Sequence, residues 1–253
     1  MYTRIKTPEE IEDMRYSGKI LAAIHKKLIP EVKPGVTTKY LADIAAKEIK
    51  KLGGKPAFLG YGHPNPFPDV ICISVNNEVV HGIPSSDKIL KDGDIVSLDL
   101  GVMYNGMITD AAISVICGRA SPEIEEFLEH TKKSLHAGLK VVKNGCQVGD
   151  ISNAIQKYLE RYGYGIVRDL VGHGVGHEVH EDPNIPNYGS KRSGPKLVSG
   201  MTVAIEPMVT LGNHGVYTED DGWTVSTNDG SLAAHFEHTI LVTDKGCEIL
   251  TSL

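Results

Sequence analysis

Five side chains of the kinds that bind metal ions lie in segments that otherwise read as strands and tight turns. They are Asp99, Asp110, His173, Glu206 and Glu237. Three of the carboxylates stand within or beside apolar runs such as Ile95–Leu100, where an ionised group needs a strong positive partner. A metal centre would supply that partner, so the spacing and surroundings of these residues point to metal chemistry.

The first two acids can be placed by counting residues from a turn. The Asn-Gly pair at 105–106, between two apolar runs, is typical of a two-residue type I′ hairpin turn, which needs positive φ at both central positions. Counting back from it, Gly101 faces Asp110, and Asp99 lies two residues further along the same face. The two carboxylates are then diagonal neighbours roughly 7 to 8 Å apart at the backbone, close enough to share ions. The alternative is a pair of solvent-facing acids on an edge hairpin.

The histidine of the set stands in a glycine-rich run. Glycines at 172, 174 and 176 indicate backbone close to a ligand or in conformations that other residues avoid. We expect His173 to be a metal ligand, although a histidine in an apolar segment is often only hydrogen-bonded in the core. The segment His177–His180 is one residue short of the H-E-x-x-H zinc motif, and His177 is expected to be structural or on the surface.

Residues that begin and end regular structure predict four helices and six strands. The helices are expected over 8–28, 38–52, 121–143 and 150–162, where capping residues, prolines and glycines bound amphipathic stretches. Strands are expected near 70–75, 94–104, 107–117, 202–210, 234–242 and 247–250, with 172–200 as a long functional loop system. This is an α+β fold, in which helices cover one face of a mainly antiparallel sheet.

Similar strings recur in the two parts of the chain. The stretches 32–53 and 142–163 both begin with Val-Lys-x-Gly and end with Gly, at a constant offset of 110 residues. We therefore predict one domain, 1–253, whose halves, 1–118 and 119–253, are related by an approximate twofold axis. Chance similarity among short strings is the alternative.

Composition limits the classes of function. A net charge of −6 and a pI near 6.0 argue against a general nucleic-acid binder or a binder of anionic membranes. The N-terminus lacks the apolar core of a signal peptide and no run is long enough to span a membrane, so a cytoplasmic protein is expected. The four cysteines have no paired spacing, and Cys72 reads as a small buried hydrophobe or as the lining of a pocket.

With these residues in view, the chain resembles the methionine aminopeptidases of type I, which belong to the pita-bread metallopeptidases. The resemblance covers nearly the whole chain. It is carried by Asn76–Pro84, the Asp99 to Asp110 hairpin, Gly172–Gly176 with His180–Pro183, Ile205–Met208, Trp223 and Phe236–Thr239.

The resemblance implies a pita-bread fold and removal of the initiator methionine from nascent polypeptides by metal-activated water. It implies two divalent ions (cobalt, manganese, iron or zinc) bound by Asp99, Asp110, His173, Glu206 and Glu237, with Asp110 and Glu237 bridging. Glu206, His81 and His180 are expected to be catalytic, and both histidines to contact the substrate. The methionine pocket is expected to include Phe58, Tyr61, Phe67, Cys72 and Trp223. The partners implied are the N-terminal methionine and a transient ribosome contact, for a protein that is monomeric.

Two departures keep other functions open. Val179 stands where many type I enzymes carry phenylalanine, and His235 stands where glutamine is frequent. An X-Pro aminopeptidase or prolidase-like peptidase is therefore the second hypothesis, and a non-catalytic pita-bread binding protein is the third. Release of methionine from Met-Ala-Ser, release of residues before proline, or neither would discriminate among the three.

Overall fold

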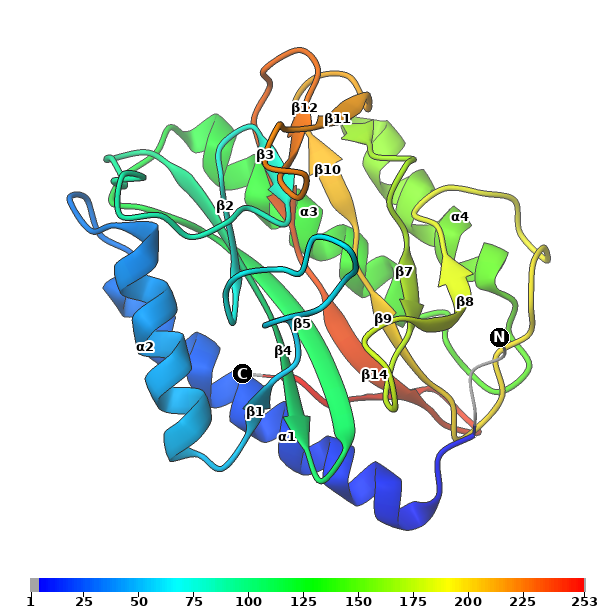
Figure 1. The fold of residues 1–253 in the computed structure, drawn as a ribbon. Coiled ribbons are helices and arrows are strands. Elements are labelled where there is room, and N and C mark those ends of the chain that lie inside the picture. The colour runs from blue at the N-terminus through cyan, green and yellow to red at the C-terminus, as the bar shows by residue number, and fades with distance from the viewer. Residues whose placement is uncertain (1–4, 253) are drawn as a thin grey trace.

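The computed structural model describes residues 5–252 as helices that cover a set of antiparallel sheets (Figure 1). The helices are α1 (Pro8–Leu28), α2 (Thr38–Lys51), α3 (Pro122–Leu139) and α4 (Val148–Leu159), with short 3-10 turns η1 (Ile29–Glu31) and η2 (Glu160–Tyr162). The strands are β1 (Lys55–Pro56), β2 (Cys72–Val75), β3 (Glu78–Val80), β4 (Ile95–Tyr104), β5 (Met107–Ile116), β6 (Gly165–Ile166), β7 (Gly172–Gly174), β8 (Glu181–Ile185), β9 (Thr202–Ile205), β10 (Met208–Thr210), β11 (Val216–Thr218), β12 (Val225–Thr227), β13 (Ala233–His235), β14 (His238–Val242) and β15 (Cys247–Ile249).

Helix α1 begins where its capping residues predict. The hydroxyl of Thr7 accepts from the backbone N–H of Glu10 at 3.2 Å, and the Glu10 carboxylate accepts from the N–H of Thr7 at 2.8 Å. This reciprocal pair satisfies two donors that the first turn of a helix leaves free. The prediction for 8–28 is confirmed, and that for 38–52 holds to within one residue, since α2 ends at Lys51.

The other two helices differ at their ends from the prediction. Helix α3 ends at Leu139 and not near residue 143, because the next residues form tight turns, with Val142 N–H donating to the Leu139 carbonyl at 3.2 Å. Helix α4 begins at Val148 and not at Asp150. The carboxylate of Asp150 reaches back to accept from the N–H of Gln147 at 3.0 Å, so Asp150 is the third helical residue and Gln147 is the cap.

The long hairpin of β4 and β5 has the predicted register. Gly101 pairs with Asp110 and Asp99 pairs with Ala112, which places both acids on the same face. The opposite face of β4 presents Leu98 and Leu100 to α1 and α2, in one of the large apolar clusters of the molecule. The turn chemistry alone was therefore enough to place the two carboxylates.

Two strands predicted as continuous are each divided, and the break falls at an acid. Strands β9 and β14 pair with each other, whereas β10 and β13 pair in a separate sheet, so the chain changes sheets after Ile205 and again before His238. Pro207 lacks an N–H for the ladder, and the N–H of Glu237 donates to Ala112 of β5 at 2.9 Å. The backbone thus bends at Glu206 and Glu237, where a continuous strand was expected.

The helices form two groups on the outer side of the sheets (Figure 1). Helices α1 and α2 cover the β4–β5 hairpin. Helix α3 packs on β9 and β13, and α4 packs on α3 and β8, in a second apolar cluster that contains Phe127, Ile155 and Ile205. All strand pairs in residues 5–252 are antiparallel, as expected. Seven short strands were not predicted: β1, β3, β6, β7, β8, β11 and β12. The prediction of 172–200 as a loop was wrong at β7 and β8, which extend the sheet of β9 and β14. The division at residue 118 into related halves stays a prediction. Within the described residues, no helix has the length and apolar character needed to span a bilayer.

Candidate metal centre and adjoining cavity

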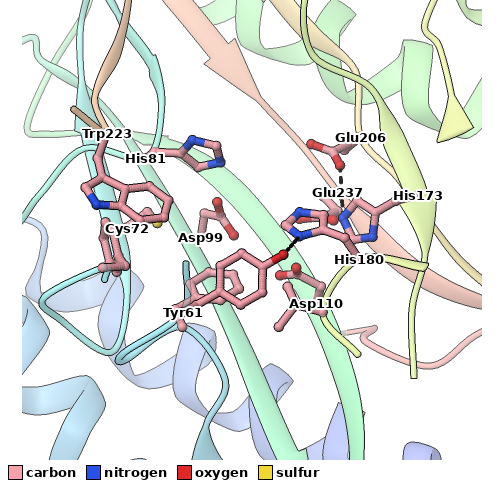
Figure 2. A pocket seen from close by; sticks show the side chains of 13 residues that line it. Tyr61, Cys72, His81, Asp99, Asp110, His173, His180, Glu206, Trp223 and Glu237 are labelled. Carbon is pink, nitrogen blue, oxygen red and sulfur yellow. Dashed lines mark hydrogen bonds and ion pairs between the residues drawn. The ribbon is translucent and has the colours of Figure 1, made fainter. Parts of the chain in front are cut away.

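The five predicted metal ligands come from five different places in the fold and line one cavity (Figure 2). Asp99 and Asp110 stand on β4 and β5, His173 on β7, Glu206 just after β9, and Glu237 just before β14. All five residues are buried. The structure therefore brings together all the residues that were singled out for their chemistry.

A buried threonine connects the two acid-bearing layers. The hydroxyl of Thr239 accepts from the N–H of Asp110 at 2.8 Å and donates to the carbonyl of the same residue at 2.7 Å. On the other side, β14 pairs with β9 so that His238 faces Ile205. Continued by one residue, this register sets Glu206 beside Glu237, and both approach Asp110.

The closest ligand group is formed by two acids and a histidine. One ligand atom each of Asp110, His173 and Glu237 lies within 4.8 Å of the others. The Nε2 atom of His173 is 3.4 Å from Glu206 Oε1, and its Nδ1 donates to the Gly174 carbonyl at 2.9 Å. In a neutral ring this bond leaves the lone pair on Nε2, directed at the carboxylates, which is the form that binds a metal.

Burial and crowding disfavour charge on all four carboxyl groups. Removal from water raises the pKa of Asp110 to about 8, and the charge of Glu206 adds to this effect. Burial likewise raises the pKa of Glu206 to about 8, and the pKa values of Asp99 and Glu237 are raised by burial first and by the neighbouring acids second. Burial, and next to it the neighbouring His180, lowers the pKa of His173 to about 3, so its ring is neutral. The cluster lacks positive charge.

A divalent metal ion would supply the positive charge that the cluster lacks. Asp99 Oδ1 and Asp110 Oδ1 are buried and have no hydrogen-bond partner, although such atoms are nearly always satisfied in folded proteins. In the described part of the chain, no lysine or arginine lines the cavity. Carboxylate oxygens and a neutral imidazole nitrogen are ligands for manganese, iron, cobalt and zinc alike, so the donor set fits such ions without selecting one.

At the mouth of the cavity, His180 contacts a tyrosine. The Tyr61 hydroxyl lies 2.7 Å from His180 Nδ1, and the His180 ring is 4.3 Å from that of His173 (Figure 2). The pKa of Tyr61 is raised, chiefly by burial, so its hydroxyl keeps its proton and can donate to Nδ1. The proton of a neutral His180 ring is then on Nε2. Tyr61, expected only as part of the apolar pocket, thus also orients this histidine.

The other side of the cavity is apolar. Phe58, Phe67 and Cys72 are buried there, and Trp223 meets Phe67 edge to face with ring centroids 5.3 Å apart. His81 adjoins the indole at a centroid distance of 6.1 Å. Burial raises the pKa of the Cys72 thiol, which keeps it neutral. All five predicted pocket residues and His81 therefore lie beside the carboxylate cluster.

Two further residues belong to this site and were not assigned to it. Val179 lines the apolar wall. His235 is buried with Nε2 3.3 Å from Glu206 Oε2, so Glu206 lies between two imidazoles. Their positions in the sequence pointed to the site, since Val179 precedes His180 and His235 stands two residues before Glu237. Only the fold shows that their side chains face it.

The comparisons with known proteins agree with this geometry. The model of metallopeptidase family M24 matches residues 12–244. A methionine aminopeptidase of Clostridium acetobutylicum is 49% identical over 98% of this chain and 98% of its own length. The crystal structure of a methionine aminopeptidase from Thermotoga maritima superposes with a TM-score of 0.96, at 47% identity over 99% of this chain and all of the other. An X-Pro aminopeptidase of the same organism shares the fold at 22% identity, with a TM-score of 0.77 over 98% of this chain and 62% of its own. The pita-bread fold and the resemblance seen in the motifs are confirmed.

Proposed function

The chain belongs to metallopeptidase family M24, and from that premise we propose that it is a metal-dependent aminopeptidase that removes the initiator methionine from nascent polypeptides. The observation that carries the proposal is the position of the buried carboxylate cluster directly beside an apolar cavity walled by Phe67 and Trp223. The cluster suits hydrolysis, and the cavity suits an unbranched thioether side chain, which gains mainly from fit and dispersion.

Two divalent ions would be held by Asp99, Asp110, His173, Glu206 and Glu237. When bound, they would supply Lewis acidity and a water of lowered pKa. The four carboxylates would balance the charge of the ions, and the Nδ1 bond of His173 would keep its ring oriented.

Three side chains at the predicted metal site would take the other catalytic roles. Glu206 would accept the proton of the attacking water, because its carboxylate lines the cavity next to the other predicted ligands. His180 donates a hydrogen bond from Nε2 to the scissile carbonyl, where negative charge develops, since Tyr61 occupies its Nδ1. His81 contacts the amide nitrogen that leaves as the new amine.

Peptide cleavage tests the function directly. Protein freed of metal and then titrated with cobalt, manganese, iron or zinc should release methionine from Met-Ala-Ser, as read by mass spectrometry of the products. Release only from Xaa-Pro peptides would overturn the methionine assignment in favour of the X-Pro hypothesis. No bound metal and no free amino acid from either peptide would instead indicate a binding protein.

We also propose that the protein works as a monomer in the cytoplasm and contacts the ribosome transiently. A second cavity supports the contact, because it gathers six exposed cations on a chain of net charge −6. They are Lys140, Lys143, Lys157, Arg161, Lys191 and Arg192. Such a surface suits the phosphate backbone of RNA.

Cosedimentation with ribosomes at low and moderate salt tests this contact. Replacement of Lys140, Lys143 and Arg161 by glutamate should abolish it without loss of peptide cleavage. Equal sedimentation of the substituted and the natural protein would rule this surface out. Sedimentation velocity of the free protein checks the monomer.

A further inference from the structure

The loop that carries His180 is held from inside by one carboxylate. The loop connects β7 to β8, and the first residue of β8 is Glu181. Its Oε1 accepts from the backbone N–H of His177 at 2.6 Å and from that of Glu178 at 3.2 Å. Both donors lie within three residues of His180, so the carboxylate of Glu181 fixes the backbone that presents this histidine to the cavity.

The second oxygen of that carboxylate is paired with a lysine far away in the sequence. Lys6 Nζ lies 2.7 Å from Glu181 Oε2, and the lysine side chain is fully buried. The backbone N–H of Lys6 donates to the Gly200 carbonyl at 2.9 Å, and this bond fixes the backbone of Lys6. Lys6 also crosses directly over the loop, since a Cβ built on Gly176 would lie 2.3 Å from Lys6 Cε.

A second link joins the same two segments. His177 Nε2 lies 2.7 Å from Glu10 Oε1, and Glu10 is the acid of the capping box of α1. The predicted metal ligand His173 stands on β7, which pairs with β9 on one side and with β8 on the other, where Gly174 faces Glu181. His173 itself pairs with Ala204 of β9, whereas the side chain of Glu181 binds the loop at His177 and Glu178.

We propose that the buried Lys6–Glu181 ion pair is a positioning element of the active site, which holds the β7–β8 loop so that His180 stays over the carboxylate cluster. The proposal rests on the aminopeptidase function for its effect on turnover. Neither residue touches substrate: Lys6 acts through Glu181, and Glu181 acts through the loop backbone. Lys6, which lies just before α1, is therefore part of the catalytic architecture.

The test compares Lys6→Met with Lys26→Met in the metal-loaded enzyme. Lys26 is an exposed lysine of α1 and serves as the matched control. Lys6→Met should lower kcat by about tenfold or more, the scale expected when a group that contacts the reacting atoms is displaced, with KM and bound metal unchanged. Lys6→Arg should restore most of kcat, and Lys26→Met should match the natural protein.

A second background separates positioning from general damage. In His180→Ala enzyme, Lys6→Met should change kcat by less than about twofold, because the group through which it acts is already gone. An equal loss in both backgrounds, or no loss beside natural His180, would overturn the proposal. Should Lys6→Met fail to fold, Lys6→Met with Glu181→Gln removes both charges and is measured in its place.

A readout independent of activity completes the design. In protein labelled with ¹⁵N-histidine, the ring signals of His180, assigned by their absence in His180→Ala, should shift in Lys6→Met and not in Lys26→Met. Unshifted signals would overturn the positioning role. If the natural enzyme releases no methionine, the proposed function fails, and these signals alone decide the proposal.

Discussion

Replacement of Thr239 by valine tests how the two acid-bearing layers are joined. Valine matches threonine in shape but has no hydroxyl, so the N–H and the carbonyl of Asp110 would both lose the partner they now have at 2.8 and 2.7 Å. Thr239 is fully buried, so water cannot easily replace it. An unsatisfied buried polar group costs about 1 to 3 kcal/mol, and a small backbone shift should recover part of it. We expect the free energy of unfolding of the metal-free protein to fall by about 2 to 4 kcal/mol.

The same substitution should weaken metal binding, because Asp110 is a predicted ligand that loses its anchor. A loss of about tenfold to a hundredfold in affinity is typical for a removed supporting group. Urea unfolding and competition with a fluorescent chelator measure the two effects.

Two control variants make the reasoning refutable. Thr239→Ser keeps the hydroxyl and should retain metal affinity. Thr131→Val also removes a buried hydroxyl, but this one donates to a helical carbonyl at 2.9 Å and does not line the cavity, so metal binding should be unchanged. If Thr239→Val unfolds and binds metal as Thr239→Ser does, the threonine does not join the layers as described.

Three further predictions concern charge, chemistry and the pocket. Metal-free protein should lose stability as pH rises from about 6.5 to 8. The pKa values of Asp110 and Glu206 are about 8 in the folded protein and lower in the unfolded chain, so the folded state binds more protons in this range. The free energy of unfolding therefore falls as pH rises, until the folded state has lost these protons too. Urea midpoints that stay level or rise over this range would contradict the raised values, and added metal should remove the decline. Glu206→Ala should reduce methionine release by at least about a hundredfold and lower the number of bound ions, and near-normal release from Met-Ala-Ser would exclude its role as base. Gly62→Ala should raise KM for Met-Ala-Ser several-fold more than Gly60→Ala. Both glycines have positive φ, but only at Gly62 would a Cβ meet the Trp223 ring, at 2.7 Å. Equal KM values for the two variants would show that the Trp223 indole does not bind the substrate.

Local signals account for what was predicted correctly. The Asn-Gly turn is complete within four residues, and its geometry forces the register that pairs Gly101 with Asp110. The capping box of α1 likewise lies within Thr7 to Glu10. Such features depend on neighbours in the chain, so one sequence is enough to place them.

The errors lie where the backbone has a choice of partner. The stretches 202–210 and 234–242 were predicted as single strands, yet each changes sheets at its acid. Pro207 was visible, but the donation of Glu237 N–H to Ala112 joins residues more than a hundred positions apart. The contacts of Tyr61 with His180 and of His235 with Glu206 were missed for the same reason, because the residues of both pairs are distant in sequence.

The amino-acid sequence by itself determined the inventory of donor groups, the hairpin that carries two of them and the family to which they belong. Only the tertiary structure decided that β5 and β14 meet through Thr239, that Lys6 reaches the loop of His180, and that Glu206 stands between two imidazoles. The reason is physical: turns and caps are set by short-range sterics and hydrogen bonds, whereas the convergence of buried acids depends on packing that closes long loops and has no local signature.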